Sequence, residues 1–152
     1  MGFTQYWYRE KTIDQDIYDK IVADFKKSRE ELFNRGVLLA GLNGDGVPVI
    51  TDSQINFNGS AKLQGSGEPF KFDREIQFDN GRPRKLEPNI FQFTKTDGFS
   101  YNLAVMVFLV IAKYYLDGRI NIQSDGSQAD WDSARELCQH ILGYGKDFKL
   151  DK

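Results

Sequence analysis

The most apolar stretch of the chain runs from Tyr101 to Leu116 (YNLAVMVFLVIAKYYL) and limits the possible folds more than any other segment. Its central part, Leu103–Ala112, contains no charge, glycine or proline and is longer than a typical strand. A membrane span needs roughly 20 apolar residues, and this run is shorter. A helix that is apolar nearly all round is normally buried. We therefore expect a buried central helix at residues 101–116.

One side of this helix is less apolar than the rest. At about 100° per residue, four residues fall on one narrow stripe: Asn102, Met106, Leu109 and Lys113. The stripe is either part of the core or a surface through which the protein associates with itself. Ser100 is the expected N-cap of the helix, and Gly118 is the expected residue just past its end.

A strand pattern lies on each side of the central helix. Phe91 and Phe93 alternate with other residues in Asn89–Thr96 (NIFQFTKT), and Arg119–Gln123 (RINIQ) follows the helix. A strand, a helix and a strand within about 35 residues permit a right-handed crossover between parallel strands. The pattern leaves an antiparallel placement of 119–123 equally open.

The remaining segments predict further strands and two more helices. A strand is expected at Phe3–Arg9, and an amphipathic helix at Asp14–Arg35. A last helix should begin after an N-cap at Ser127 or Asp125 and reach Leu142. Short strands are expected at Val37–Ala40, Val47–Ile50, Ser53–Asn58, Pro69–Phe72 and Glu75–Phe78. The sequence predicts one α+β domain over residues 1–152, in which a mostly antiparallel or mixed sheet packs with about three helices.

The length, charge and cysteine content exclude several classes of protein. A chain of 152 residues suits one domain, and a net charge of −2 does not favour general binding to nucleic acid or anionic membranes. The single cysteine, Cys138, excludes an internal disulfide and fits a reducing cytosol. The opening MGFTQYWYRE lacks the basic and apolar regions of a signal peptide. These features predict a cytoplasmic protein with no membrane partner.

The chain carries no strong catalytic or metal-binding motif. His140 is the only histidine, and it lies two residues from Cys138, so the two side chains would point to different faces of a helix. A structural zinc site needs four such ligands. The turn Asn43–Gly46 (NGDG) lacks the twelve-residue pattern of a calcium loop, and phosphate-binding glycine motifs are absent. We therefore predict no catalytic residue, no metal and no cofactor.

A weaker constellation lies where the strand before the central helix ends. Hydroxyls, a lysine and the free N–H groups of a helix N-terminus can together hold an anion. If 119–123 runs parallel to 89–96, its end meets the same edge, where open sheets bind ligands. The alternative is that these groups only cap the helix and solvate the edge. The candidate ligand-binding residues are Thr94, Lys95, Thr96, Ser100, Tyr101, Ser124, Asp125 and Trp131.

The most basic stretch is the polar loop Asp79–Pro88. Three of its residues, with three neighbouring aromatic residues of the first strand, could contact nucleic acid: Arg82, Arg84 and Lys85 with Tyr6, Trp7 and Tyr8. A cluster of three cations in a net acidic chain is more often a solvated loop. Nucleic acid is therefore an unfavoured partner.

Three segments are distinctive: the opening MGFTQYW, FQFTKT followed by Tyr101, and the closing pattern SDG…DW…A..LC..ILGYG. Together they resemble a protein family of phage and prophage genomes, over both ends and the second half of the chain. Thr94 stands where that family often has cysteine, and Tyr114–Tyr115 where it has a histidine-containing helix end. The resemblance implies a phage setting without a particular mechanism, and it implies no family thiol or histidine base here.

These observations favour a small phage accessory protein that acts by binding in the cytoplasm of its host cell. Its partner would be a host protein, as for an inhibitor of host defence, or a small anionic, nucleotide-like ligand; homo-oligomers are also open. The alternatives are a metal- or carboxylate-dependent phosphoesterase or nuclease, with Lys95 or the scattered acids Asp125, Asp130 and Glu136, and a nucleic-acid-binding protein. A protein partner predicts an exposed apolar patch, and a small ligand predicts a polar, partly aromatic pocket.

Overall fold

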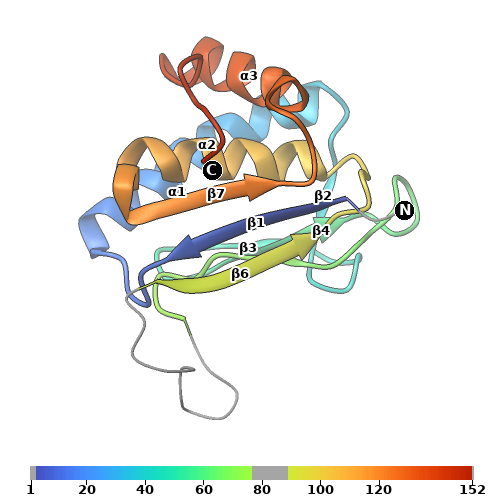
Figure 1. Ribbon diagram of the computed structural model, residues 1–152. Coiled ribbons are helices and arrows are strands. Elements are labelled where there is room, and N and C mark those ends of the chain that lie inside the picture. The colour runs from blue at the N-terminus through green and yellow to red at the C-terminus, as the bar shows by residue number, and fades with distance from the viewer. Residues whose placement is uncertain (1–2, 77–88, 152) are drawn as a thin grey trace.

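The chain forms two small antiparallel sheets and three α-helices, shown in Figure 1 as a computed structural model that describes residues 3–76 and 89–151. Within these residues the elements follow in the order β1 (Thr4–Arg9), α1 (Gln15–Asn34), β2 (Leu39–Ala40), β3 (Val49–Ile50), β4 (Ile55–Gly59), β5 (Phe70–Lys71), β6 (Ile90–Lys95), α2 (Asn102–Leu116), β7 (Ile120–Ser124) and α3 (Asp132–Leu142). Single turns of 3₁₀ helix precede β7 and α3. The predicted α+β single-domain fold is confirmed.

The first sheet has the strand order β6-β1-β7, with β1 antiparallel to both neighbours. Gln5 lies opposite Thr94 of β6 on one side and opposite Ser124 of β7 on the other. Strands β6 and β7 therefore run parallel to each other with β1 between them, and β6-α2-β7 is a split β-α-β unit. All the strand pairs among the described residues are antiparallel, so the sheet is not mixed.

The second sheet is built around β4, which pairs with β2, β3 and β5. Its strands are shorter than the sequence predicted, since turns and loops occupy much of 41–54 and 60–69. Of the strand expected at Glu75–Phe78, residues 77–78 lie outside the described residues, and the described part forms a single bridge between Thr12 and Glu75. The basic loop expected at 79–88 also lies outside them.

Helix α2 is the centre of the hydrophobic core, as predicted. Phe108, on this helix, lies fully buried between the helical and sheet layers. Its ring centroid is 5.2 Å from that of Phe25 on α1 and 5.2 Å and 5.0 Å from those of Phe70 and Phe72. Figure 1 shows α2 running behind the three-stranded sheet, with α3 above it. None of the helices in the described residues is long and apolar enough to cross a membrane.

The stripe on α2 is part of the core, which is one of the two alternatives that the sequence left open, and it is not exposed for self-association. Met106 is 6% exposed and Leu109 is fully buried. The stripe faces polar groups of the protein itself: Asn102 Oδ1 accepts a hydrogen bond from Gln5 Nε2 at 3.0 Å, and Lys113 reaches the C-terminal segment. A polar side chain within an apolar helix therefore marks an internal contact here.

Two predicted helix ends also differ from the structure. Ser100 makes no side-chain capping bond to α2; its carbonyl instead accepts the Leu103 N–H at 3.2 Å. At the other end the left-handed residue is Asp117, with φ of +48°, rather than Gly118. The chain enters the 3₁₀ turn Asp117–Arg119 directly, which moves the change of direction one residue earlier than the glycine indicated.

The start of the last helix follows one of the two predicted caps. Ser127 forms a capping box with Asp130 over a 3₁₀ turn, and α3 then begins at Asp132. Asp125, the other candidate, turns to β1 instead, where its carboxylate accepts the Thr4 N–H at 3.0 Å. The helix reaches Leu142, as predicted, and Gly143, with φ of +84°, ends it.

Candidate functional site

The two faces of the three-stranded sheet differ sharply in their surroundings. Because side chains alternate along a strand, β1 directs Gln5, Trp7 and Arg9 into the protein, where they are at most 1% exposed. Tyr6 and Tyr8 therefore point to the opposite side of the sheet. This opposite side is the solvent face.

Four aromatic rings gather on the solvent face, and we call them the aromatic face: Tyr6, Tyr8, Phe91 and Phe93. Across the strands Tyr6 lies opposite Phe93, and Tyr8 opposite Phe91. Ring centroids are 5.1 Å apart for Tyr8 and Phe91, and 5.8 Å apart for Phe91 and Phe93. Tyr8, Phe91 and Phe93 remain 37%, 46% and 53% exposed. The alternation in the sequence placed Phe91 and Phe93 together, but it did not indicate that their face meets solvent.

The groups that border the aromatic face are polar and nearly balanced in charge. Asn121 and Gln123 face Tyr8 and Tyr6 from β7, and they share a hydrogen bond of 3.1 Å. The Tyr6 hydroxyl donates to Asp125 at 2.6 Å, and this hydrogen bond raises the pKa of the phenol. Exposed Lys95 on β6 and Asp125 after β7 lie at the same end of the sheet.

The outer edge of β6 is open beside the aromatic face. Thr96 N–H bonds to the Phe3 carbonyl toward β1, whereas the N–H and C=O of Lys95 both bond to Glu68 on the other side. Hydrogen-bonding directions alternate along a strand, so the backbone groups of Phe91 and Phe93 also point away from β1. Within the described residues they have no hydrogen-bond partner.

The outer edge of β7 is covered by the C-terminal segment. Asp151 N–H donates to the Ile122 carbonyl at 2.9 Å, and Ile122 N–H donates to the Asp151 carboxylate at 2.8 Å. Lys113 Nζ bonds to both oxygens of that carboxylate, at 3.2 and 3.1 Å, and to the Ile120 carbonyl at 2.9 Å. This edge therefore offers no backbone groups at Ile122 to another strand.

The residues predicted to bind an anion do meet at one end of the sheet, because β6 and β7 run in the same direction. Half of them are buried, with at most 1% exposure: Thr94, Thr96, Tyr101 and Trp131. Lys95, Ser100 and Asp125 are exposed, and Ser124 is half-buried. The structure thus brings the strand ends together but covers much of the set.

The polar groups of this set are bonded within the protein. The Thr96 hydroxyl donates to Asn102 Oδ1 at 2.8 Å, and the Tyr101 hydroxyl donates to the Glu68 carbonyl at 2.5 Å. Burial raises the pKa of the Tyr101 phenol. The N–H groups of Phe99, Asn102 and Leu103 bond to carbonyls of the same turn, Ser124 Oγ accepts the Gly126 N–H, and Trp131 stacks on Phe148. This arrangement favours the alternative in which these residues cap the helix and close the sheet edge.

The glycine-rich loop before β5 explains why this end of the sheet is covered. A Cβ atom at Gly67 would lie 2.7 Å from both the Lys95 carbonyl oxygen and the Tyr101 hydroxyl. At Gly59 a Cβ would lie 2.2 Å from the Gly65 carbonyl oxygen. Only glycine allows the loop to come this close, so Gly67 and Gly59 are the sequence signal for the cover.

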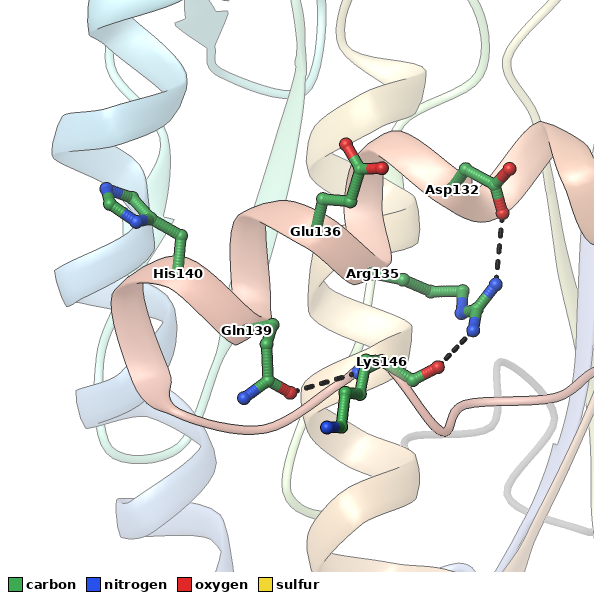
Figure 2. Close-up of a pocket in the computed structure, with 6 residues that line it drawn as sticks. All are labelled: Asp132, Arg135, Glu136, Gln139, His140 and Lys146. Carbon is green, nitrogen blue, oxygen red and sulfur yellow. Dashed lines mark hydrogen bonds and ion pairs between the residues drawn. The ribbon is translucent and has the colours of Figure 1, made fainter.

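The outer side of α3 carries a pocket of about 510 Å³ (Figure 2). Arg135 donates to Asp132 Oδ1 at 3.0 Å and to the Lys146 carbonyl, and Gln139 Oε1 accepts the Lys146 N–H at 3.3 Å. In Figure 2 the ring of His140 points away from the other five labelled side chains. The pocket therefore mixes acidic and basic groups, of which Arg135 and Asp132 form an ion pair, and gathers no group of cations.

A larger hollow of about 820 Å³ lies between α2, α3 and the C-terminal segment. Tyr114 lines it and stacks on Tyr144, with ring centroids 3.7 Å apart. Its three lysines are matched by three aspartates, and Lys113 is already paired with Asp151: Lys113, Lys146, Lys149, Asp117, Asp147 and Asp151. Its charge does not select an anion.

The groups considered for catalysis do not converge. Asp125 bonds to Tyr6, Asp130 closes the turn before α3, and Glu136 lies on the outer side of that helix. In residues 3–76 and 89–151, no three His, Cys, Asp or Glu side chains could together hold a metal ion. Cys138 is buried, and burial raises the pKa of its thiol to about 12, so it is a neutral core residue. His140 is exposed, in agreement with the prediction that the two side chains point to different faces of the helix.

The fold and the site define an α+β domain with an exposed aromatic sheet face and one open sheet edge. Comparisons with protein-family models, curated proteins and solved structures find no match to this chain. The aromatic face and the edge of β6 are therefore the features of this chain from which a function can be inferred.

Proposed function

We propose that this protein is a small phage-type accessory protein that acts by binding a host protein through its aromatic face in the host cytoplasm. The observation that carries the proposal is the exposure of three neighbouring aromatic rings, Tyr8, Phe91 and Phe93, on one sheet face. The sequence resemblance to phage proteins supports the choice of a host protein as partner.

Covering the exposed rings of the aromatic face with a partner would contribute favourable free energy of binding. Fully burying a Phe side chain is worth about 1.5–3 kcal/mol, and aromatic residues dominate the energetics of protein interfaces. The rings of Phe91 and Phe93 are held by stacking and by the β1–β6 register, so little side-chain freedom remains to be lost on binding. Polar groups at the rim, such as Gln123 and Asp125, would fix orientation.

The other candidate partners have less support. A nucleic acid needs several cations near the stacking rings, and the described residues around the aromatic face supply Lys95 beside Asp125. A small anion at the strand ends would compete with the internal bonds of Thr96 and Tyr101. The aromatic face therefore fits a protein better than a phosphate-bearing ligand.

A photo-crosslinking amino acid in place of Phe93 tests the proposal in host cells that express the protein. A matched control carries the same group at Phe33, which is 64% exposed on α1, away from the aromatic face. We expect a discrete crosslinked host polypeptide from position 93 only, abolished by Tyr8→Ser. Equal labelling from both positions, or none from position 93, would refute the proposal.

A second measurement separates a protein partner from nucleic acid. Fluorescence anisotropy with a labelled single-stranded oligonucleotide at low salt should give no saturable binding. Binding that weakens steeply with salt and is lost in Phe91→Ser would instead assign the rings to base stacking.

A further inference from the structure

We propose that the open edge of β6 pairs with the same edge of a second copy of this chain. The result is a two-fold symmetric dimer in which two three-stranded sheets join into one sheet of six strands. The inference concerns the backbone edge and not the aromatic face, so it does not rest on the proposed function.

The available backbone groups define how long this pairing can be. Outward-pointing groups belong to alternate residues of β6, and those of Lys95 already bond to Glu68. Within the described part of the strand this leaves Phe91 and Phe93 as the two residues with outward N–H and C=O groups and no partner. A pairing strand must therefore meet these two residues.

One register satisfies both residues in both copies. In an antiparallel pair centred on Gln92, Phe91 of each copy lies opposite Phe93 of the other, and each opposed pair exchanges two hydrogen bonds. A register shifted by two residues toward Lys95 would require the groups already bonded to Glu68. The opposite shift leaves Phe91 against Phe91 and requires Asn89, which is outside the strand.

The number of open sheet edges favours a second copy of this chain, rather than a strand of an unrelated protein, as the partner of β6. The edge of β7 is sealed by Asp151, so the part of the chain that the structure describes has one open edge of this sheet in each molecule. Two copies joined at β6 leave no such edge in either, and growth stops at the dimer. An added strand from another protein would bring a new open edge of its own.

Charge and side chains are compatible with the symmetric pairing. Lys95 is the single charged residue of β6, and the two copies of it would lie six residues apart, about 20 Å at 3.3 Å per residue. Phe91 and Phe93 would form cross-strand aromatic pairs across the axis. The aromatic faces of the two copies would then be continuous.

A proline at position 93 tests the role of the edge. It removes the outward N–H and no hydrogen bond to β1, because Phe93 points its backbone away from that strand. Phe93→Ala removes the ring but keeps the N–H and serves as the matched control. The probe is analytical ultracentrifugation of the whole chain from low micromolar to high micromolar concentration, with circular dichroism to check the fold.

We expect a dimer for the unmodified chain and a rise in its dissociation constant of about 30-fold or more in Phe93→Pro, since each dimer loses two hydrogen bonds. Phe93→Ala should weaken the dimer clearly less. A monomer at all concentrations, or a Phe93→Pro protein that is folded and dimerises normally, would overturn the proposal.

Disulfide trapping tests the register. Phe91→Cys and Phe93→Cys proteins are mixed and oxidised; the native Cys138 is buried and should not react. A disulfide between the two variants, with neither variant crosslinking to itself, is expected, because opposed residues lie about 5.5 Å apart between Cα atoms. Self-crosslinking of either variant alone would overturn the register centred on Gln92.

Discussion

The two outer edges of the three-stranded sheet differ in how far other segments of the chain cover them. At β7 the chain returns after α3, and Asp151 bonds to both backbone groups of Ile122. At β6 only the last residue, Lys95, is covered, by Glu68. The same sheet thus ends in a sealed edge on one side and, within the described residues, an open edge on the other.

The two edges also differ in whether they are protected against pairing with another strand, and in the means of that protection. Proteins usually guard exposed edges with lysine, proline, bulges or a covering segment. The β7 edge has a covering segment held by the ion pair of Lys113 and Asp151. Among residues 3–76 and 89–151, none of these devices protects the centre of the β6 edge, which carries Phe91 and Phe93, residues that favour pairing. Phe91 and Phe93 therefore belong both to the open edge, through their backbone groups, and to the aromatic face, through their rings.

Removing the cover of β7 should have the largest effect. A chain that ends at Phe148 loses the hydrogen bonds between Asp151 and Ile122 and the packing of Leu150 against the core. We expect a loss of about 3 kcal/mol in the free energy of unfolding, because each hydrogen bond is worth about 1 kcal/mol and the apolar contact adds to this. Urea denaturation measures the loss.

The control for this truncation is Lys149→Ala, which keeps the segment and alters one exposed side chain. It should change the free energy of unfolding by less than about 0.5 kcal/mol. The truncated protein should also aggregate more readily, since both edges of its sheet are then open. An equal stability of the truncated and full chains would mean that the segment does not protect β7.

The inner side of β6 should tolerate change poorly, although its outer side is open. Trp7 is buried, and its Nε1 donates to Gln92 Oε1 at 3.0 Å. Gln92→Leu leaves this indole N–H without an acceptor and should destabilise the protein by about 2 kcal/mol in urea denaturation. Gln92→Glu keeps an acceptor oxygen and should lose less. If the two variants are equally stable, the hydrogen bond does not hold β6 in place.

The ion pair at the sealed edge should contribute less than either of these changes. Lys113 and Asp151 side chains are 20% and 25% exposed, so water screens them in part. A double-mutant cycle with Lys113→Met and Asp151→Asn should give a coupling energy of about 1 kcal/mol that falls with added salt. Additive single effects would assign the seal to the backbone hydrogen bonds alone.

The sequence was sufficient to predict the helices and strands of the central part of the fold, but not which face of each strand is buried. The charge-free run Leu103–Ala112 predicted α2 and its burial, because few other places suit so apolar a helix. Alternation predicted β1, β6 and β7, but period two is the same whichever face is buried, so the exposure of Phe93 could not be predicted. That exposure depends on which face the helices cover.

The prediction of the candidate anion site from the sequence was limited for a different reason. The sequence correctly implied that Thr96 and Ser124 meet at one sheet end if their strands are parallel, and they are. The Thr96 and Ser124 hydroxyls bond to nearby groups, whereas the Lys95 carbonyl and the Tyr101 hydroxyl are covered by a segment far away in the chain, the loop at Gly67. Glycine in a loop is common, so its composition alone did not indicate this close approach.

Alkaline pH should loosen the sealed edge by a smaller, graded effect. The C-terminal segment is anchored by Tyr144, whose hydroxyl donates to Asp24 at 2.8 Å, beside the hydroxyl of Tyr115 at 2.6 Å. Burial, followed by the hydrogen bond to Asp24, raises the pKa of Tyr115 to about 12, and the same causes raise that of Tyr144. In the unfolded chain both phenols would lose their protons near pH 10.

The free energy of unfolding should decrease as the pH rises above 10. Between pH 10 and about 12 the folded state keeps protons that the unfolded state has lost, so the stabilisation is complete below pH 10 and is lost as pH rises through 12. At pH 7, Tyr115→Phe should have a lower melting temperature than the unmodified protein, because the lost hydrogen bond contributes about 1 kcal/mol to the free energy of unfolding. The gap in melting temperature should shrink from pH 10 to 11.5. Other buried tyrosines titrate in both proteins, so a gap that stays constant would show that the Asp24 cluster does not anchor the segment through its protons.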